Sequence, residues 1–386
     1  MSVSDPISTS TQTDLVQIQQ DERWMNEALD LAQRSVGLAS PNPAVGCVLV
    51  KGESVVGQGF HEYDLRDHAE IVALRMAGGE AHGATAYVTL EPCCTTGRTG
   101  PCTDALIEAG VAKVVVAATD PNPAVNGQGI ERLRAAGVAV VSGILAQRAR
   151  ELNDGFARHI RTGLPFVTLK GGLSLDGRIA PAPGKAPTGA PVIMTGEASR
   201  TAVQQLRHGS DALITGINTV LLDDPLLTDR TGRPRRRRLL RVVLDSALRL
   251  RLDSKLVRTA QEDVLVFCTI PVSERQRALE ALGVRVERIE AAPGSPRVSL
   301  KRVIERLGEM QMTSAMIEAG CQVMSSAVAV QAIDKVSLFY APVFLGAAGV
   351  PMLSNIELTR PQWVSVSTEQ LGEDFWFKGY LRDPWA

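Results

Sequence analysis

The sequence predicts two consecutive domains, both of the layered α/β class. The chain has 386 residues, which is more than one ordinary domain requires. Short apolar segments alternate with amphipathic ones, as in sheets that are covered by helices. This alternation begins anew near residue 165, after an amphipathic stretch and a turn. We therefore predict a disordered tail at 1–20, a first domain at 21–163 and a second domain at 164–386.

The first twenty residues are rich in Ser, Thr and Gln and lack the charged start and apolar core of a signal peptide. We expect a frayed tail and a cytoplasmic protein. The first helix is predicted from Asp21 to Gly37, because Trp24, Met25 and Ala28 recur at helical spacing. Asp21 is placed to cap this helix and Gly37 to end it.

The remaining elements follow from the pattern of apolar residues. In the first domain, strands are predicted at 44–50, 53–60, 84–90, 112–120 and 138–143, with helices at 68–78, 102–110 and 129–137. In the second, strands are predicted at 165–172, 241–246, 264–269, 284–289 and 336–346, with helices at 199–209 and 299–310.

Composition excludes two classes of protein. Hydrophobic residues make up 45% and charged residues 22% of the chain, and no apolar run approaches the roughly 18 residues of a membrane span. Lys and Arg total 41 against 42 Asp and Glu, so the chain lacks the positive field of a dedicated nucleic-acid-binding protein. Six arginines do crowd into 231–241, where we expect a solvated loop.

Three of the six cysteines lie within ten residues, which suggests a metal site in a reducing compartment and not a disulfide framework. His68 and the thiolates of Cys93 and Cys102 supply three ligands for zinc. Three protein ligands leave one tetrahedral position open, as in catalytic sites, where a bound water becomes hydroxide near neutral pH. If Cys94 were a fourth ligand, the site would instead be structural.

Glu70 lies two residues beyond His68, which suits a carboxylate that shuttles a proton beside the metal. An H-x-E motif followed by P-C is the zinc-deaminase signature, although eight residues here separate Cys93 from Cys102. His61 stands at the end of a predicted strand that enters the site, so we expect it to contact substrate.

These motifs resemble the bifunctional riboflavin-biosynthesis deaminase/reductase family. The resemblance rests on PNPAVGCVLV, HAEIVALRMAG, AYVTLEPC and GRTGPC in the first half, and on LKGGLSLDGRIA, TGINTVLLDDPLLTDR, RVVLDS and IEAG in the second. The long spacing between the two thiolates is typical of this family. The resemblance implies an N-terminal cytidine-deaminase-like three-layer domain and a C-terminal dihydrofolate-reductase-like α/β domain.

The resemblance also implies two reactions on one small phosphorylated pyrimidine. The 2-amino group of a diaminopyrimidinone ribosylamine phosphate is removed by hydrolysis, with Zn²⁺ as the metal. The ribosyl group is then reduced to ribityl, with NADPH as the hydride donor. Family members usually assemble through their reductase domains, which implies a dimer or tetramer.

By similarity, each proposed site residue has a role. In the first half, His68, Cys93 and Cys102 bind zinc, Glu70 shuttles the proton, and Asn42, His61 and Arg98 contact the pyrimidine or its phosphate. In the second half, the cofactor is bound by Gly172, Ile193, Thr219, Asp223, Ser246 and the stretch 320–326 that begins with Gly320, and the substrate by Arg207, Leu227, Arg230 and Glu318. Lys170 is a candidate proton donor.

Some positions depart from the family pattern and leave alternatives open. Cys94 and Thr95 replace the usual Ser-His or Ala-His pair, and the usual Ser-x-Trp is replaced by 191–193. A paralogue that serves another flavin-like or azapteridine pathway, or a protein with one active half, would show such changes. Two further hypotheses are a deaminase acting on an RNA base and a zinc-stabilised sensor of a flavin precursor.

Overall fold

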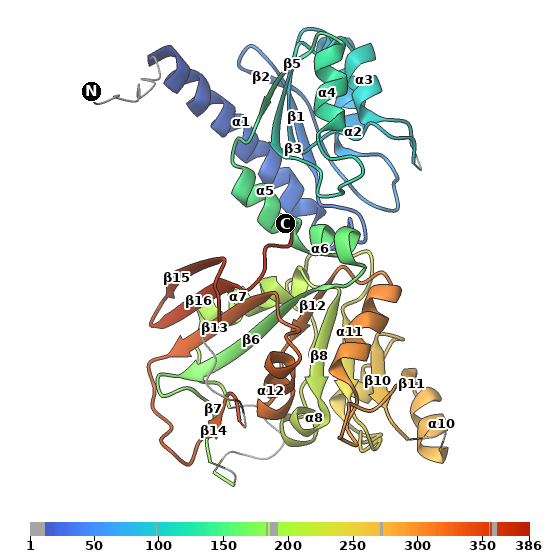
Figure 1. The fold of residues 1–386 in the computed structure, drawn as a ribbon, viewed down its shortest axis with the longest axis vertical. Helices are drawn as coiled ribbons and strands as arrows, with labels where there is room; N and C mark the ends of the chain where they lie inside the picture. Colours follow the sequence, from blue (N-terminus) through green and yellow to red (C-terminus); the bar gives the residue numbers. More distant parts are fainter. Residues whose placement is uncertain are drawn as a thin grey trace, which may run out of the picture. The chain divides into compact units, whose positions relative to one another are not determined.

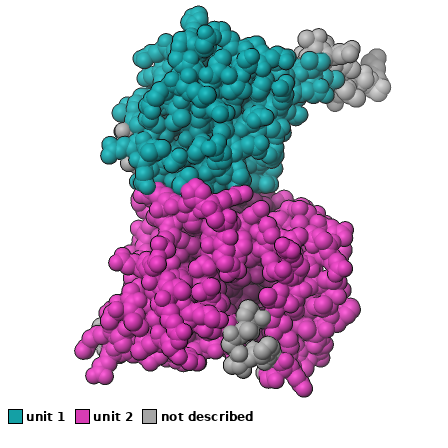
Figure 2. Space-filling model, turned by 180° about the vertical axis from the view of Figure 1, so that it is seen from behind, with its two compact units in different colours: residues 1–153 teal, residues 154–386 magenta. Residues whose placement is uncertain are grey.

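A computed structural model describes residues 12–97, 99–182, 184–185, 192–270, 273–354, 356 and 361–386. The chain divides into two compact units, residues 1–153 and 154–386 (Figure 2). Each unit has its own sheet, and each is described separately below.

The first unit is built on a five-stranded sheet in the order β2-β1-β3-β4-β5 (Figure 1). Its strands are β1 (Gly46–Lys51), β2 (Ser54–Phe60), β3 (Thr85–Leu90), β4 (Lys113–Ala118) and β5 (Ala139–Ser142). Its helices are α1 (Gln12–Ser35), α2 (Ala69–Ala77), the 3₁₀ turn η1 (Gly78–Ala81), α3 (Cys102–Glu108), α4 (Gln128–Ala135) and α5 (Ala146–Leu152). All the strands and helices predicted in this half are present.

Helices cover both faces of this sheet, and two glycines show how closely they approach it. A Cβ on Gly46 would lie 2.0 Å from the carbonyl oxygen of Ala28 in α1, and one on Gly59 would lie 2.6 Å from that of Ala69 in α2. Gly59 pairs with Cys47, the neighbour of Gly46, so the two glycines face opposite sides. The unit therefore has three layers, as predicted (Figure 1).

The first helix is longer than predicted. It begins at Gln12, so part of the expected tail is helical, whereas residues 1–11 lie outside the described part of the chain. Asp21 is not a cap: it is 3% exposed, and its carboxylate accepts hydrogen bonds from Tyr87 Oη at 2.9 Å and Lys113 Nζ at 2.8 Å. These partners come from neighbouring strands, which the local sequence pattern does not reveal. Within the described residues, no helix is long and apolar enough to cross a membrane.

The division between the units falls between Asn153 and Asp154, earlier than the boundary expected near residue 163. The amphipathic stretch before that point forms two helices, α5 and α6 (Asp154–Thr162), and α6 belongs to the second unit. Asn153 Oδ1 accepts the backbone N–H of Ala44 at 2.7 Å in the first unit. Asp154 Oδ2 accepts the hydroxyl of Tyr380 at 2.6 Å in the second.

The second unit is built on a nine-stranded sheet in the order β11-β10-β9-β8-β12-β6-β13-β16-β15. Its strands are β6 (Phe166–Ser174), β8 (Ala212–Gly216), β9 (Leu240–Leu244), β10 (Val264–Cys268), β11 (Val284–Arg288), β12 (Ser314–Ile317), β13 (Lys335–Ala341), β15 (Ser365–Leu371) and β16 (Asp374–Tyr380). A separate pair is formed by β7 (Arg178–Ala180) and β14 (Val350–Pro351). The further helices are α7 (Glu197–His208), α8 (Ile217–Asp223), α9 (Lys255–Arg258), α10 (Glu274–Glu280), α11 (Leu300–Glu309) and α12 (Cys321–Ala329).

The strands from β11 to β13 in this order are parallel. At one edge, β16 pairs antiparallel with β13, and β15 pairs antiparallel with β16. The strands and helices predicted for this half are present. The elements that were not predicted are β7, β8, β12, β14, α8, α9, α10, α12 and the hairpin of β15 and β16. In open parallel sheets, ligands bind outside the carboxyl ends of the strands. We therefore expect ligand-binding residues directly after the central strands β9, β8, β12 and β6.

Candidate active sites

Three side chains with metal-binding atoms meet in the first unit. His68 immediately precedes α2, Cys102 is the first residue of α3, and Cys93 lies in the loop after β3. His68 Nδ1 is 3.5 Å from Cys93 Sγ and 3.2 Å from Cys102 Sγ, and the three ligand atoms all lie within 4.8 Å of one another. One imidazole and two thiolates suit zinc and leave a tetrahedral position for substrate or water.

The surroundings of Cys93 favour its thiolate, which is the form that binds metal. A hydrogen bond from the Cys102 thiol and another from His68 hold the pKa of Cys93 well below its usual range. The backbone N–H of Cys102 also donates to Cys93 Sγ at 3.3 Å. Among the described residues, the group that could hold this metal does not include Cys94. The arrangement therefore fits a three-ligand site better than a closed four-ligand one.

Glu70 stands in the first turn of α2, two residues after His68. Its side chain is buried, and burial raises its pKa to about 6. A carboxyl group with a pKa near the working pH can both accept and release a proton. Its position and its pKa suit the proton shuttle expected from the sequence.

The structure brings His61 and Asn42 together beside the three ligands. His61 is 3% exposed, and its ring centroid lies 5.3 Å from that of His68 in an edge-on arrangement. His61 Nδ1 is 2.8 Å from the carbonyl oxygen of Asp67, which can only accept, so Nδ1 carries the proton. His61 Nε2 then accepts from Asn42 Nδ2 at 3.1 Å. Arg98 lies outside the described residues.

In the second unit, Glu318 joins two cations from different elements. Lys170 of β6 donates to Glu318 Oε1 at 3.0 Å, and Arg207 of α7 donates to Oε2 at 2.8 Å. Burial alone would raise the pKa of Glu318, but the charges of Lys170 and Arg207 outweigh burial and lower it to about 2. Glu318 is therefore a fixed carboxylate that orients both cations.

Three of the expected cofactor residues follow neighbouring parallel strands. Ser246 comes after β9, Thr219 after β8 and Gly320 after β12. A Cβ on Gly320 would lie 3.7 Å from Thr219 Oγ1, so the backbone of one residue approaches the side chain of the other. Gly320 precedes the first turn of α12, whose free N–H groups suit a phosphate.

The other three expected cofactor residues are less closely connected. Gly172 lies in β6, where an added Cβ would meet only Thr195 Cγ2 at 3.9 Å. Ile193 is 65% exposed, and Asp223 is the last residue of α8, where burial raises its pKa. In the part of the chain that the structure describes, no hydrogen bond links Ile193 or Asp223 to Ser246, Thr219 or Gly320.

The arginine-rich segment 231–241 is not simply a solvated loop. Arg241 is 1% exposed and pairs with Asp263 at 2.8 Å, and Arg235 donates to the carbonyl oxygen of His208 at the end of α7 at 2.6 Å. A sequence pattern shows the charges but not their partners. The signal for Arg241 was its place at the start of a predicted strand, where a buried charge requires a partner.

Comparison with known protein families gives a separate match for each half of the chain. Residues 18–118 match the cytidine and deoxycytidylate deaminase zinc-binding region, and residues 165–377 match the RibD C-terminal domain. The riboflavin biosynthesis protein RibD of Actinobacillus pleuropneumoniae is 39% identical over 359 residues, which cover 92% of this chain and 93% of that protein. The chain belongs to the RibD family.

Other RibD proteins agree over the same length. That of Escherichia coli is 38% identical and covers 92% of this chain and 98% of its own. Acinetobacter baumannii RibD superposes with a TM-score of 0.79 at 38% identity, covering 94% of this chain and 99% of its own. A deaminase/reductase from Thermotoga maritima gives 0.78 at 30% identity, with the same coverage.

Membership of the RibD family tests several of the expectations from sequence. The cytidine-deaminase-like and dihydrofolate-reductase-like folds are confirmed for the two halves. This RibD protein is a bifunctional enzyme of riboflavin biosynthesis, with a zinc-binding deaminase domain and a reductase domain that uses a nicotinamide cofactor. Similarity along both halves does not favour a paralogue of another pathway.

Proposed function

We propose that the first unit removes the 2-amino group of a diaminopyrimidinone ribosylamine phosphate by hydrolysis. The second unit then reduces the ribosyl group of the product to ribityl with NADPH. The observation that carries this proposal is the cluster of His68, Cys93 and Cys102 with buried Glu70 on a chain that continues into a RibD reductase domain. The Thermotoga maritima neighbour is named as the deaminase and reductase of these two substrates, which supports the assignment.

In the deaminase, His68, Cys93 and Cys102 hold the zinc ion, which when bound activates water for attack on the ring carbon. Glu70 takes the proton released from this water and passes it to the departing amino group, so that ammonia leaves and a carbonyl remains. His61 and Asn42 bind the pyrimidine, with the Asp67 carbonyl fixing the tautomer of His61. Arg98 contributes a guanidinium group for the substrate phosphate or ring.

In the reductase, Gly172, Ile193, Thr219, Asp223, Ser246 and Gly320 bind NADPH, which supplies the hydride. Arg207, Leu227, Arg230 and Glu318 bind the substrate. Reduction of the opened sugar also needs one proton on its oxygen, and Lys170 is the candidate donor because Glu318 holds its ammonium group at 3.0 Å. Full reductase turnover in Lys170→Met would remove Lys170 from this role.

We also propose that the enzyme is a cytoplasmic homo-oligomer, a dimer or tetramer, joined through its second unit. What supports an interface is β15, an edge strand whose residues Ser365 to Gln370 are all exposed. Unpaired edges of this kind readily pair with another chain. Light scattering on the full chain should give the mass of two or four copies, and the mass of one chain would overturn this part.

The deciding experiment combines zinc content with both activities. We expect bound zinc, ammonia release from the diaminopyrimidine ribosylamine phosphate, and NADPH oxidation by the deaminated product. Glu70→Gln should retain zinc and NADPH oxidation, while ammonia release falls by about 10²–10⁴-fold because the proton shuttle is lost. Undiminished ammonia release in this variant would contradict the role of Glu70. Zinc without either activity in the wild type would contradict the proposed substrate.

A further inference from the structure

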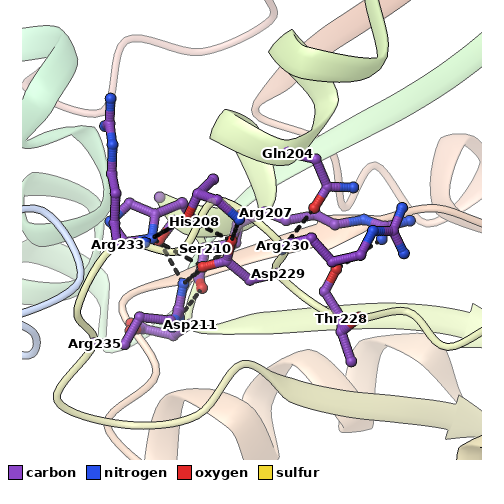
Figure 3. Close-up of polar contacts among 12 residues, drawn as sticks. Gln204, Arg207, His208, Ser210, Asp211, Thr228, Asp229, Arg230, Arg233 and Arg235 are labelled. Atoms are coloured by element: carbon purple, nitrogen blue, oxygen red, sulfur yellow. Dashed lines mark hydrogen bonds and ion pairs between the residues drawn. The ribbon is translucent and has the colours of Figure 1, made fainter.

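The loop 226–231 is held in place by three side chains from two other elements, β9 and α7. Arg241 of β9 donates to the carbonyl oxygen of Leu226 at 3.0 Å, and Arg207 of α7 donates to that of Thr228 at 2.9 Å. The backbone N–H of Arg230 donates to Gln204 Oε1 at 2.8 Å (Figure 3). Gln204 and Arg207 are three residues apart and share one face of α7, so the loop lies against this face.

The loop contains a backbone conformation that leucine rarely adopts. Leu227 has a φ of 54° and is 4% exposed. Left-handed backbone at a residue with a large side chain persists only where the surrounding structure enforces it. The hydrogen bonds from neighbouring elements are therefore what keep the loop in this shape.

Asp229 is the centre of these interactions. Its Oδ2 lies 2.9 Å from His208 Nδ1 and 3.3 Å from Arg235 Nη1. Its Oδ1 accepts the backbone N–H of Thr231 at 2.9 Å and the hydroxyl of Thr231 at 2.8 Å. The carboxylate is only 8% exposed. Figure 3 shows Asp229 together with His208 and Arg235. The Asp229 carboxylate therefore faces donors of this chain and is largely shielded from solvent.

Arg235 connects this carboxylate to the end of α7. Besides Asp229, its guanidinium donates to the carbonyl oxygens of Arg207 at 3.2 Å, His208 at 2.6 Å and Ser210 at 2.7 Å. These carbonyls belong to the last turn of the helix and the residues after it, where they lack partners within the helix. A planar group with five N–H donors can satisfy several of them at once.

We propose that Asp229 is a positioning residue of the reductase, which with Arg235 and His208 locks the loop 226–231 to the end of α7. Arg207 comes from the helix and Arg230 from the loop, so this lock fixes the two arginines relative to each other. This inference rests on the proposed function of the second unit, in which both arginines bind substrate. It assigns a role to Asp229, His208 and Arg235 that requires no contact with substrate.

The lock should affect substrate binding more than the chemical step. Arg207 keeps its two hydrogen bonds to Glu318 without Asp229, and Lys170 keeps its own. The groups proposed for proton transfer therefore stay in place when the loop is released. The loop must then be ordered each time substrate binds, which weakens binding.

The first test separates KM from kcat. In Asp229→Asn, the reductase KM should rise about tenfold while kcat changes by less than about twofold. Ammonia release by the first unit of the same chain serves as an internal control and should not change. Asp253→Asn, which removes an exposed ion pair with Arg251, is the matched control and should leave both reductase parameters unchanged. An unchanged KM, or a fall in kcat alone, would overturn the proposal.

The second test does not depend on turnover. In the substrate-free full chain, the backbone amides of Arg230 and Thr231 should exchange with deuterium faster in Asp229→Asn than in the wild type. Arg235→Lys keeps the charge but loses the fork, and it should show the same acceleration if Asp229→Asn does not fold. Unchanged exchange in a folded variant means that Asp229 does not hold the loop. If the wild type lacks reductase activity, the proposed function fails, and the exchange rates still decide whether the lock exists.

Discussion

The carboxylate of Glu91 accepts the backbone N–H of Gly129 at 2.8 Å, although 38 residues separate them in the chain. Glu91 also accepts the backbone N–H groups of Asp120 at 3.0 Å and Gly127 at 2.9 Å. A Cβ on Gly129 would lie 2.2 Å from the carbonyl oxygen of Pro92. The start of α4 is thus packed directly against the segment that leads into Cys93.

This contact predicts that Glu91→Gln weakens zinc binding without altering any ligand. An amide keeps only one acceptor oxygen and loses the charge, so some of these buried N–H groups lose their partner. We expect zinc to be lost at about tenfold lower chelator concentration than from the wild type, measured by metal analysis after dialysis. Gly129→Ala should act in the same direction, while NADPH oxidation stays unchanged. Equal zinc retention in both variants would refute this role of Glu91.

Two cysteine variants distinguish an open metal site from a closed one. Cys102→Ser should lose zinc and ammonia release, because it removes one of three ligands. Cys94→Ser should retain both, because Cys94 lies outside the group of three. Metal analysis of the two purified proteins is sufficient. Loss of zinc from Cys94→Ser would instead favour a structural four-ligand site.

Asp21→Asn should destabilise the first unit. In the wild type, Lys113 Nζ lies 2.8 Å from the Asp21 carboxylate, and both side chains are largely buried. The substitution removes the negative charge that pairs with Lys113. We expect a loss of about 2–3 kcal/mol in the free energy of unfolding, measured with denaturant. The matched control is Glu80→Gln, whose pair with Lys51 is exposed, and it should cost less than about 0.5 kcal/mol. Equal effects of the two substitutions would contradict a stabilising role for Asp21.

Glu318 predicts a specific response of the second unit to acid. Its pKa is lowered from 4.5 to about 2 in the folded protein. Its contribution to stability is therefore complete above pH 4.5 and is lost as the pH falls towards 2, by up to about 3 kcal/mol. At neutral pH, Glu318→Gln should be less stable than the wild type. Between pH 4.5 and pH 2, it should lose less stability than the wild type does. Denaturant titrations of both proteins at several pH values test this. If the free energy of unfolding depends on pH in the same way in the wild type and in Glu318→Gln, the lowered pKa is contradicted.

The sequence predicted most of the first unit because its signals are local. Apolar periodicity located the strands and helices, and the spacing of His68, Cys93 and Cys102 indicated a metal site whose ligand atoms do converge in space. The early start of α1 was missed because the Ser, Thr and Gln content of residues 1–20 suggested a frayed tail, and the apolar residues Leu15, Val16 and Ile18 in this stretch are exposed. Residues 12–20 extend α1 at its N-terminal end, ahead of the part of the helix that is buried.

The sequence was less informative where partners are distant. The pairing of Arg241 with Asp263, and of Arg235 with Asp229 and the end of α7, depends on how β9 and α7 pack and not on local periodicity. The hairpin of β15 and β16 was missed because β15 is exposed on both faces and lacks the alternation of a half-buried strand. The ion pairs of Glu318 required three elements to meet, which no spacing rule describes.

The junction at Asn153 and Asp154 has a consequence for the gene. Each residue is bonded within its own unit, Asn153 to Ala44 and Asp154 to Tyr380 and Trp385. The polypeptide passes from one unit to the other only once, between residues 153 and 154. A single recombination event between these two codons therefore separates the two enzymes and leaves the hydrophobic core of each unit whole. Evolution can therefore duplicate, exchange or discard one catalytic step of the pathway while inheriting the other intact.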